Sequence, residues 1–247
     1  MLPQRLEEVS LNAWPALQQM LFDGWVLRFA QGYTKRANSV NAVFPSSMDV
    51  NEKIDICEQT YARHGLPTVF RLTPLAHPTH LDQILQQRHY DRIDLTHVQH
   101  IDLLRQDTPP MVTTTLQEEA LDTWMPIFCR LSGAELARHR THKAILQTIP
   151  ARRLLASLRV SGRVVACGLG VLEHTYFGLF DLVTAPEKRN KGYGAALVLN
   201  LLAWARAHGA TDAYLQVVST NSPARHLYAK LGFRDVYQYW YRVPQRS

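Results

Sequence analysis

The sequence has little cysteine, no long apolar run and no clustered charge of one sign, and each absence excludes a class of protein. Its three cysteines, Cys57, Cys129 and Cys167, lie far apart. Their odd number does not suit a disulfide framework, and no pair has metal-ligand spacing, so we expect reduced thiols and no metal site. No apolar run approaches the roughly 18 residues of a membrane-spanning helix. The N-terminus lacks the basic-then-apolar order of a signal peptide, so we expect a soluble, cytoplasmic protein with no membrane contact.

The 247 residues carry a net charge of +6, with an isoelectric point of about 9.3. A basic protein can bind nucleic acid, but it can equally bind a small anionic ligand. The lysines and arginines are scattered, and no zinc-finger, RNP-like or basic-helix pattern occurs. The densest basic stretch, residues 138–143, falls in a segment of helical character and is expected to be a solvated face. We therefore expect no nucleic-acid partner.

The best break in the chain is a polar stretch at residues 105–110. It contains Pro109 and Pro110, which resist both helix and strand. The break predicts two domains, residues 1–106 and residues 111–247.

The C-terminal part alternates between the strand period and the helix period. Residues 194–208 are almost wholly apolar on two faces, which is typical of a helix buried against a sheet. Helical character over residues 117–150 is expected to divide at Pro126 and Gly133. Further predicted elements are strands over residues 111–115, 154–160, 164–172, 176–183, 213–218 and 233–243, and a helix over residues 222–231.

The N-terminal part repeats the second half of this order: helix 54–64, strand 68–72, helix 79–88 and strand 92–103. A histidine-glycine pair followed by two aromatic residues occurs at similar spacing in both parts. The matched positions are His64, Gly65, Phe70 and Tyr90 against His208, Gly209, Tyr214 and Phe233. We expect an internal repeat, although common strand-to-helix punctuation could produce the same match. Residues 24–30 and 33–40 precede this order and predict a hairpin joined at Gly32.

A glycine-rich loop joins strand 176–183 to helix 194–208. Gly192 and Gly194 let the backbone adopt positive φ and approach a ligand closely. Successive N–H groups at the start of a helix suit a pyrophosphate, and Arg189 and Lys191 add positive charge. A plain tight turn would explain the same glycines.

A second motif lies about thirty residues downstream and runs from Asn221 through Ala224, Leu227, Tyr228, Lys230 and Gly232 to Phe233. The pair of motifs, in this order of strands and helices, resembles the GCN5-related N-acetyltransferase (GNAT) family. The resemblance covers residues 111–247. It implies an α+β fold with a mixed, mostly antiparallel central sheet flanked by helices. Residues 1–106 look similar to the shortened, non-catalytic N-terminal halves of tandem members.

The resemblance implies an acetyl-CoA-dependent transfer of an acetyl group to a primary amine. Tyr228 is then expected to protonate the departing thiolate, although it could simply pack under the sheet. Asn221 is expected near the pantetheine, although it could simply cap a helix. The family also implies pantetheine contacts from Leu182, Val183 and Thr184, and pyrophosphate contacts from Arg189, Asn190, Lys191, Gly192, Tyr193, Gly194 and Ala195.

The general base is the part of the family pattern from which this sequence departs. Many relatives carry a glutamate at positions that align with Gly178 and Gln216 here. Asp181 is the nearest acidic candidate, although it could be a structurally paired carboxylate. Glu135, Glu173 and a water relay are further alternatives. A coenzyme A-binding sensor or regulatory module without turnover therefore stays open, as does a longer acyl donor.

The N-terminal part has no glycine-rich loop, and Leu85 stands where Tyr228 would align. We expect one coenzyme A site per chain. The aromatic final strand, with Tyr237, Tyr239, Trp240 and Tyr241, suggests an exposed edge that could form a homodimer. The acceptor amine is not readable from the sequence.

Overall fold

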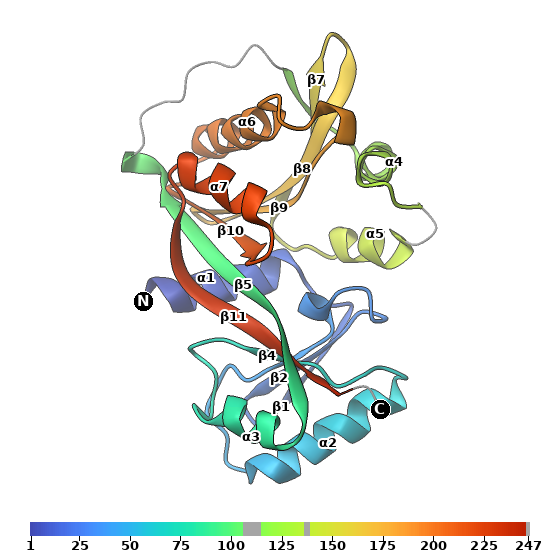
Figure 1. The fold of residues 1–247 in the computed structure, drawn as a ribbon, viewed down its shortest axis with the longest axis vertical. Helices are drawn as coiled ribbons and strands as arrows, with labels where there is room; N and C mark the ends of the chain where they lie inside the picture. Colours follow the sequence, from blue (N-terminus) through green and yellow to red (C-terminus); the bar gives the residue numbers. More distant parts are fainter. Residues whose placement is uncertain (106–114, 136–138, 246–247) are drawn as a thin grey trace. The chain divides into compact units, whose positions relative to one another are not determined.

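A computed structural model describes residues 1–105, 115–135 and 139–245 (Figure 1). The chain divides into two compact units, each made of two segments. The first unit comprises Met1–Ala13 and Val98–Val236, and the second comprises Trp14–His97 and Tyr237–Ser247. These units differ from the contiguous segments 1–106 and 111–247, because the first helix and the end of the last strand each belong to the unit that is distant in sequence.

The first unit has a central sheet in the order β11-β5-β10-β9-β8-β7-β6. β6, β7, β8 and β9 pair in an antiparallel manner, and β9 and β10 pair in parallel. The strands are β5 (Tyr90–Asp102), β6 (Thr115–Glu118), β7 (Arg152–Val160), β8 (Arg163–Glu173), β9 (Tyr176–Thr184), β10 (Asp212–Val218) and β11 (Arg234–Pro244). This is the mixed, mostly antiparallel sheet that the sequence predicted.

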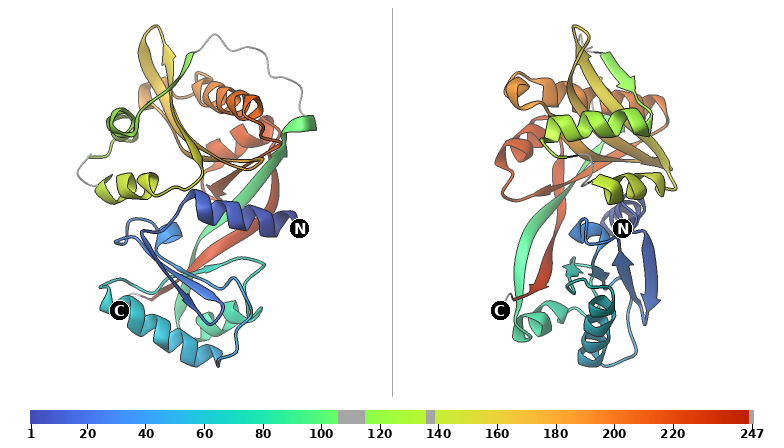
Figure 2. Two further views of the ribbon diagram at one scale, coloured as in Figure 1. Left: turned by 180° about the vertical axis from the view of Figure 1, so that it is seen from behind. Right: turned by 90° about the vertical axis from the view of Figure 1, so that its right-hand side faces the viewer.

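Helices cover both faces of this sheet (Figure 2). α6 (Tyr193–Ala207) and α7 (Ser222–Lys230) share one apolar core with the sheet. α1 (Leu2–Ala13), α4 (Leu121–Ser132) and α5 (Arg140–Gln147) lie on the other face, where α1 and α4 contact β8 and β9. A helix that packs against a sheet must bury its apolar stripe, which is why α6 is the most apolar of these segments.

Several predicted boundaries in this unit were wrong. Pro126 lies inside α4 and does not divide it; the helix ends at Gly133. α1 was not predicted. The predicted strand at residues 111–115 falls mostly outside the described residues, and β6 begins at Thr115.

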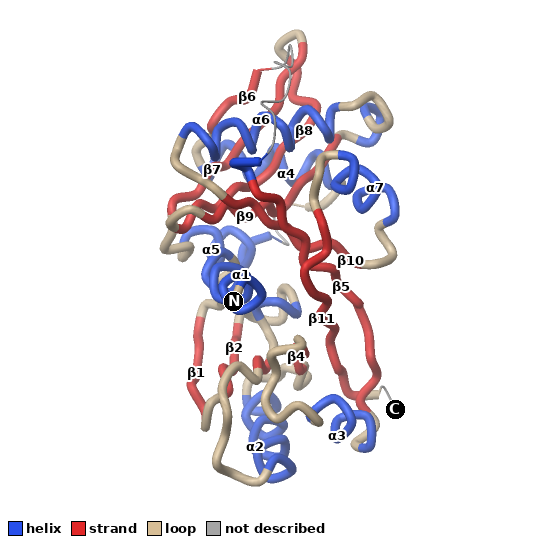
Figure 3. Tube along the Cα trace, turned by 90° about the vertical axis from the view of Figure 1, so that its left-hand side faces the viewer, coloured by secondary structure: helices blue, strands red, loops and turns tan. Residues whose placement is uncertain are grey.

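The second unit has the strand order β1-β2-β3-β4-β11-β5 (Figure 3). Its further strands are β1 (Gln18–Phe22), β2 (Trp25–Phe29), β3 (Val40–Asn41) and β4 (Phe70–Leu72), and its helices are α2 (Val50–Arg63) and α3 (Leu81–Gln87). Both helices contribute to one apolar core with the strands, including Tyr61 of α2 and Leu85 of α3.

The predicted hairpin at residues 24–40 is only partly correct. β2 does pair with the following strand, but that strand is the two-residue β3, and Lys35–Ala37 forms a 3₁₀ turn before it. Asn38 is buried, and its Oδ1 accepts hydrogen bonds from the N–H groups of Ala30 and Gly32 at 2.7 and 2.9 Å. The side chain of Asn38 therefore accepts hydrogen bonds that the backbone of a longer strand would otherwise accept. The hairpin that forms is β1–β2, which was not predicted.

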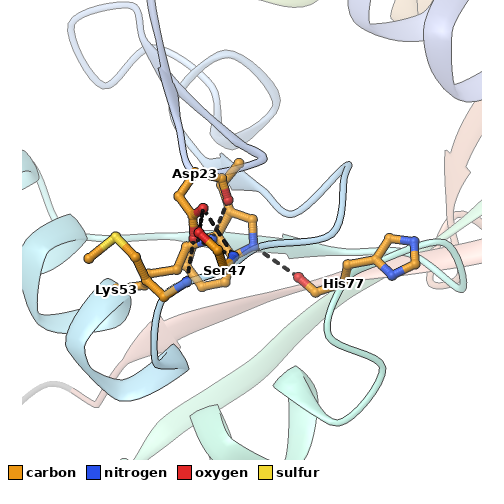
Figure 4. A network of polar contacts seen from close by, with 6 residues as sticks. Asp23, Ser47, Lys53 and His77 are labelled. Atoms are coloured by element: carbon orange, nitrogen blue, oxygen red, sulfur yellow. Dashed lines mark hydrogen bonds and ion pairs between the residues drawn. The ribbon is translucent and has the colours of Figure 1, made fainter.

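A polar network ties the β1–β2 turn to the segment before α2 (Figure 4). The Asp23 carboxylate accepts hydrogen bonds from the backbone N–H groups of Ser47 and Met48 at 3.0 to 3.1 Å, and from the Ser47 hydroxyl at 2.8 Å. Lys53 has a fully buried side chain, and its ammonium donates to the Asp23 carbonyl at 2.6 Å and lies 3.2 Å from the carboxylate. The pKa of Asp23 is lowered well below its usual range, chiefly by the backbone N–H donors.

The order α2-β4-α3-β5 in the second unit matches α6-β10-α7-β11. In both cases the strand before the first helix pairs in parallel with the strand after it, β3 with β4 and β9 with β10. The two helix ends also agree in detail: the Nδ1 atoms of His64 and His208 each bond the carbonyl four residues earlier, at 2.9 and 2.7 Å. The structure thus supports the internal repeat, both in the order of the elements and in the matching hydrogen bonds of the two histidines.

The predicted exposed edge at the final strand was wrong. β11 lies between β4 and β5, so it is an interior strand. Tyr237, Tyr239 and Tyr241 are 8%, 1% and 5% exposed. These aromatic residues belong to the protein core and offer no edge for pairing with a second chain.

Candidate active site

Strand β9 carries an irregularity at the centre of the first unit. Its parallel pairing with β10 runs from Tyr176 to Leu179, although β9 continues to Thr184. Against β8, the register shifts so that Asp181 and Leu182 oppose Gly168 alone, which is a β-bulge. A Cβ at Gly168 would lie 2.6 Å from Cδ2 of Leu182, so the missing side chain makes room for Leu182. The bulge separates the end of β9 from β10.

Asp181 is the strained residue of this bulge, with a φ of +49°. Aspartate tolerates the left-handed region better than most residues, and such strain is often retained at functional sites. Its carboxylate Oδ2 lies 2.8 Å from Nε2 of His142 on α5. Asp181 therefore points toward the face of the sheet that α4 and α5 cover, and it is a paired carboxylate.

The glycine-rich loop follows β9 directly. A 3₁₀ turn over Pro186–Lys188 leads to Asn190 and Gly192, whose φ angles are +59° and +79°. Gly192 is the N-cap of α6, and the first hydrogen bond of the helix runs from Ala196 N–H to Gly192 C=O at 2.9 Å. The N–H groups of Tyr193, Gly194 and Ala195 precede that bond, so this end of the helix can accept an anion. Arg189 and Lys191 are exposed beside it.

The two sequence motifs meet at Gly194. A Cβ at this position would lie 3.4 Å from Cδ2 of Leu227 on α7 and 3.5 Å from Oγ1 of Thr184 at the end of β9. The start of α6, the face of α7 that carries Leu227, and the separated end of β9 therefore converge on one place. Thr184 reaches this place, and Leu182 and Val183 precede it on β9.

Tyr228 and Asn221 have distinct environments. Tyr228 is 9% exposed and packs edge-on against Phe233, with ring centroids 6.0 Å apart. Burial raises the pKa of its hydroxyl to about 12, so Tyr228 carries its proton at neutral pH. Asn221 is the N-cap of α7, and its Oδ1 accepts a hydrogen bond from Ala224 N–H at 3.2 Å. Asn221 therefore caps the helix, and its amide nitrogen makes none of these hydrogen bonds and could donate to a ligand.

The missing glutamate has a physical explanation. A Cβ at Gly178 would lie 2.6 Å from the Tyr214 hydroxyl and 2.6 Å from the Phe180 ring. Tyr214 is buried, and its hydroxyl donates to the Val9 carbonyl of α1 at 3.0 Å. The space that a side chain at position 178 would need is therefore filled by Tyr214 and covered by α1.

Two histidines of α5 belong to the site and were not predicted. His142 is fully buried, and its ring lies 5.1 Å from Phe128 of α4. Its Nδ1 lies 3.3 Å from Nδ1 of His139, the N-cap of α5. The expectation that residues 138–143 form a solvated face was wrong at His142. The helical spacing of His142, Ile145 and Leu146, which share the buried stripe of α5, is the signal that could have revealed it.

The remaining candidates contribute less. Glu173 is held by Asn12 at 3.1 Å and by Arg5 at 3.6 Å, at the far end of β8, and Glu135 is exposed. Burial raises the pKa of the Cys129 and Cys167 thiols, so neither is a reactive thiolate. Within residues 1–105, 115–135 and 139–245, no cluster of three or more His, Cys, Asp or Glu side chains is placed to hold a metal ion.

None of the helices in the described part of the chain combines the length and the apolar character needed to cross a membrane.

Comparison with known proteins identifies relatives along the whole chain. The family model described as "Probable histone acetyltransferase Rv0428c C-terminal" matches residues 4–242. The chain is 30% identical over 248 residues to the uncharacterized N-acetyltransferase YobR of Bacillus subtilis (strain 168), and the match covers 98% of both proteins.

Solved structures share the fold. A GCN5-related N-acetyltransferase from Kribbella flavida has a TM-score of 0.76 at 16% identity, covering 99% of this chain and 96% of that one. A tandem GNAT protein from the clavulanic acid biosynthesis pathway has a TM-score of 0.65 at 12% identity, covering 98% and 88%. The match to the family model over residues 4–242 and the 30% identity to an N-acetyltransferase along 98% of both proteins show that the chain is an acyltransferase of the GCN5-related N-acetyltransferase family, and it shares its fold with solved members that include a tandem protein.

Proposed function

We propose that the protein transfers the acetyl group of acetyl-CoA to a primary amine of a small-molecule or peptide acceptor, by direct attack of the amine on the thioester. The observation that carries this proposal is the convergence of β9, the start of α6 and α7 at Gly194. The residues present fit the donor: the loop is exposed, carries Arg189 and Lys191, and offers the free end of a helix to a pyrophosphate.

The donor would lie along the loop and the separated end of β9. The backbone N–H groups of residues 190–195, with Arg189 and Lys191, would hold the pyrophosphate. Leu182, Val183 and Thr184 would hydrogen-bond the pantetheine through their backbone, since β9 no longer pairs with β10 there. The amide nitrogen of Asn221 would lie near the same arm.

The properties of the cysteines and of Tyr228 in the first unit favour direct attack by the amine over a covalent acyl-cysteine intermediate. Cys129 and Cys167 are buried with raised pKa values, so a covalent acyl-cysteine step has no activated nucleophile. Tyr228 holds its proton at neutral pH and would give it to the departing thiolate. A backbone N–H at Val183 or Thr184 would stabilise the tetrahedral oxyanion.

Thiol release tests this function. The protein is incubated with acetyl-CoA and a panel of amines that includes small polyamines, amino sugars and peptides with free N-termini, and free coenzyme A is followed with a thiol reagent. We expect at least one acceptor to raise thiol release well above the hydrolysis measured without amine. Tight binding of acetyl-CoA with no acceptor above that background would contradict the proposal and favour a coenzyme A-binding module.

The length of the acyl group is tested in the same assay. Acetyl-, propionyl- and butyryl-CoA are compared with the acceptor that the panel identifies. We expect acetyl-CoA to give the highest kcat/KM. A longer donor with the higher value would replace the acetyl group in the proposal and leave the rest intact.

A further inference from the structure

Three side chains from two elements form a continuous polar chain on the face of the sheet covered by α4 and α5. Asp181 Oδ2 lies 2.8 Å from His142 Nε2, and His142 Nδ1 lies 3.3 Å from His139 Nδ1. Asp181 comes from the bulge of β9, one residue before the segment proposed to hold the pantetheine. His139 is the N-cap of α5, and His142 follows three residues later in the first turn of the helix.

Exposure distinguishes the roles of the three groups. The His142 side chain is 0% exposed, whereas the Asp181 side chain is 17% exposed. An acceptor amine can therefore reach the carboxylate but cannot reach the enclosed imidazole. Phe128 and Trp124 of α4 pack edge-on against the His142 ring, with centroids 5.1 and 6.3 Å away, and this packing fixes the orientation of the ring.

The positions of the protons follow from the contacts. Nε2 of His142 faces a carboxylate oxygen, so that nitrogen carries the proton and donates. In the neutral ring, Nδ1 of His142 is then an acceptor, and the facing Nδ1 of His139 must donate. The pKa of His139 is lowered, first by burial and then by His142, so His139 is neutral at pH 7 and can make this donation. His139 thereby selects the tautomer of His142 that suits Asp181.

We propose that Asp181 takes the proton of the acceptor ammonium and that His142 is the positioning residue that makes it able to do so. In this step the N–H bond of the ammonium breaks and an O–H bond forms on the Asp181 oxygen not held by His142. The electron pair stays on nitrogen, which attacks the thioester carbonyl, and Asp181 later loses the proton to water. The inference rests on the proposed acetyl transfer to an amine and adds to it the base and the support of that base.

Other charged groups near the carboxylate must be considered when its protonation is varied. From β8, Cys167 faces Asp181, and from α4, Cys129 and Arg130 act on Cys167. From α5, His142 is linked to the carboxylate by an ion pair, and His139 at the N-cap of the helix is linked to His142 by a hydrogen bond. Substitutions at Asp181 and His142 that leave His139, Cys167, Cys129 and Arg130 unchanged therefore report on the histidine–carboxylate pair itself.

The first experiment compares Asp181→Asn, His142→Leu and His142→Gln by steady-state kinetics from pH 5.5 to 9.5 (a working range of about four units around neutrality). We expect D181N to lower kcat by roughly 100-fold with an unchanged KM for acetyl-CoA, because asparagine cannot take the proton. H142L should lower kcat by roughly 10-fold with an unchanged KM for acetyl-CoA, because the carboxylate loses the donor that orients it. H142Q should recover most of the activity, because its amide N–H can replace Nε2–H.

The outcomes separate this inference from the proposed function. No amine-dependent thiol release from the wild-type protein overturns the function itself. A wild-type protein that turns over, together with a fully active D181N, overturns the base. An H142L protein with full activity, or a loss of activity in H142Q as severe as in H142L, overturns the positioning role and leaves His142 as a packing residue.

A second measurement does not depend on turnover. Two-bond ¹⁵N–¹H correlation spectra of the full chain labelled at histidine identify which ring nitrogen carries the proton. We expect His142 protonated on Nε2, and we expect the tautomer of His142 to become mixed in His139→Ala. A wild-type His142 protonated on Nδ1 alone would overturn the proposal, whether or not an acceptor has been found.

Discussion

At the scale of single residues, protonation states decide which groups can act as acids. Tyr228 is buried, and the pKa of its hydroxyl is raised to about 12. A hydroxyl with that pKa is protonated at neutral pH, so Tyr228 is in the protonation state that the proposed general acid requires. The same burial means that the phenol ring also packs the core, so its two roles must be separated by experiment.

Tyr228→Phe separates them, because phenylalanine keeps the ring and removes only the hydroxyl. We expect kcat to fall by roughly 100-fold while the dissociation constant of acetyl-CoA changes by less than about twofold. Thiol-release assays measure kcat, and calorimetry measures the dissociation constant. Tyr176→Phe, at the opposite end of β9, is the matched control and should leave both unchanged. A Y228F protein with normal turnover would show that Tyr228 only packs.

Asp23 in the second unit is a different case, because its charge serves the fold. Four hydrogen bonds from Ser47 and Met48 stabilise its ionised form. A carboxylate whose pKa is lower in the folded than in the unfolded protein adds stability above its unfolded pKa and loses it as the pH falls through the folded value. At neutral pH, the ionised Asp23 carboxylate therefore makes its full contribution to the free energy of unfolding.

We expect Asp23→Asn to lower the free energy of unfolding at pH 7 and to weaken its decline in acid. Asparagine-glycine and aspartate-glycine both favour the tight turn between β1 and β2, so this change keeps the turn and removes the charge together with one acceptor oxygen. Urea unfolding at pH 7 and at about pH 3 measures the effect. Asp94→Asn, whose carboxylate forms an exposed pair with Lys35, is the control and should change little. An unchanged pH dependence in D23N would contradict the argument.

The predictability of these residues follows how local their signals are. The positions of the loop at the start of α6 and of Tyr228 on α7 could be predicted, because each belongs to a short motif whose spacing is fixed along the chain. His142 could not be assigned to the site, because its contact with Asp181 joins residues 39 positions apart. Likewise, nothing in the sequence near Gly178 shows that Tyr214 fills the space beside it.

At the scale of elements, the N-termini of two corresponding helices differ in what satisfies them. α6 begins at Gly192 without a side-chain cap. α2 begins at Asp49, whose carboxylate accepts hydrogen bonds from the N–H groups of Asn51 and Glu52 at 2.9 and 3.1 Å. The start of α2 is thus filled by the protein's own anion, whereas the start of α6 is open to an external one.

Gly192→Glu tests the open end of α6. The substitution places a side chain at a φ of +79° and a negative charge at the proposed pyrophosphate position. We expect acetyl-CoA to bind at least about 100-fold more weakly by calorimetry, roughly 3 kcal/mol. Gly194→Glu should have a similar effect on binding.

Two matched controls distinguish the effect of a negative charge at the loop from the effect of backbone strain. Gly209→Glu puts the same side chain at a φ of +88°, with open space around its Cβ, at the other end of α6. It should cost about 1–2 kcal/mol of stability and leave binding unchanged. Gly194→Ala places a Cβ at ordinary contact distances and should retain binding. Equal losses in G192E and G209E would show that the loop holds no pyrophosphate.

Helices and strands could be predicted where apolar residues recur with a clear period and turn residues mark the ends of the element. α6, α7 and the β7–β8 hairpin were placed within about two residues, which is the usual uncertainty of element ends. β1 and β2 were missed as a hairpin although Asp23-Gly24 is a turn signal, because β1 is mostly exposed and lacks an alternating pattern. Pro126 was taken as a break, yet the packing of Trp124 and Phe128 keeps α4 continuous through it.

At the scale of the whole molecule, the order of helices and strands in the first unit recurs in the second, but the matching helix starts differ: α6 has no side-chain cap, whereas α2 is capped by Asp49. The matching order of helices and strands, the two parallel strand pairs and the two histidine-capped helix ends all support duplication. In the second unit, Asp23 and Asp49 occupy backbone N–H groups of residues 47–52. Both carboxylates carry negative charge, so they oppose a phosphate as well as competing for its donors.

Stoichiometry therefore distinguishes a tandem protein with two working halves from one with a single site. We expect isothermal titration of the full chain with acetyl-CoA to fit one site per chain, and G192E to abolish that heat without revealing a second, weaker site. Asp49→Ala supplies the complementary arm: it frees two N–H donors of α2 but leaves Asp23 in place, so the stoichiometry should stay at one. A stoichiometry of two, or residual binding in G192E that D49A strengthens, would mean that the second unit also binds the donor, and the argument from its filled helix end would be wrong.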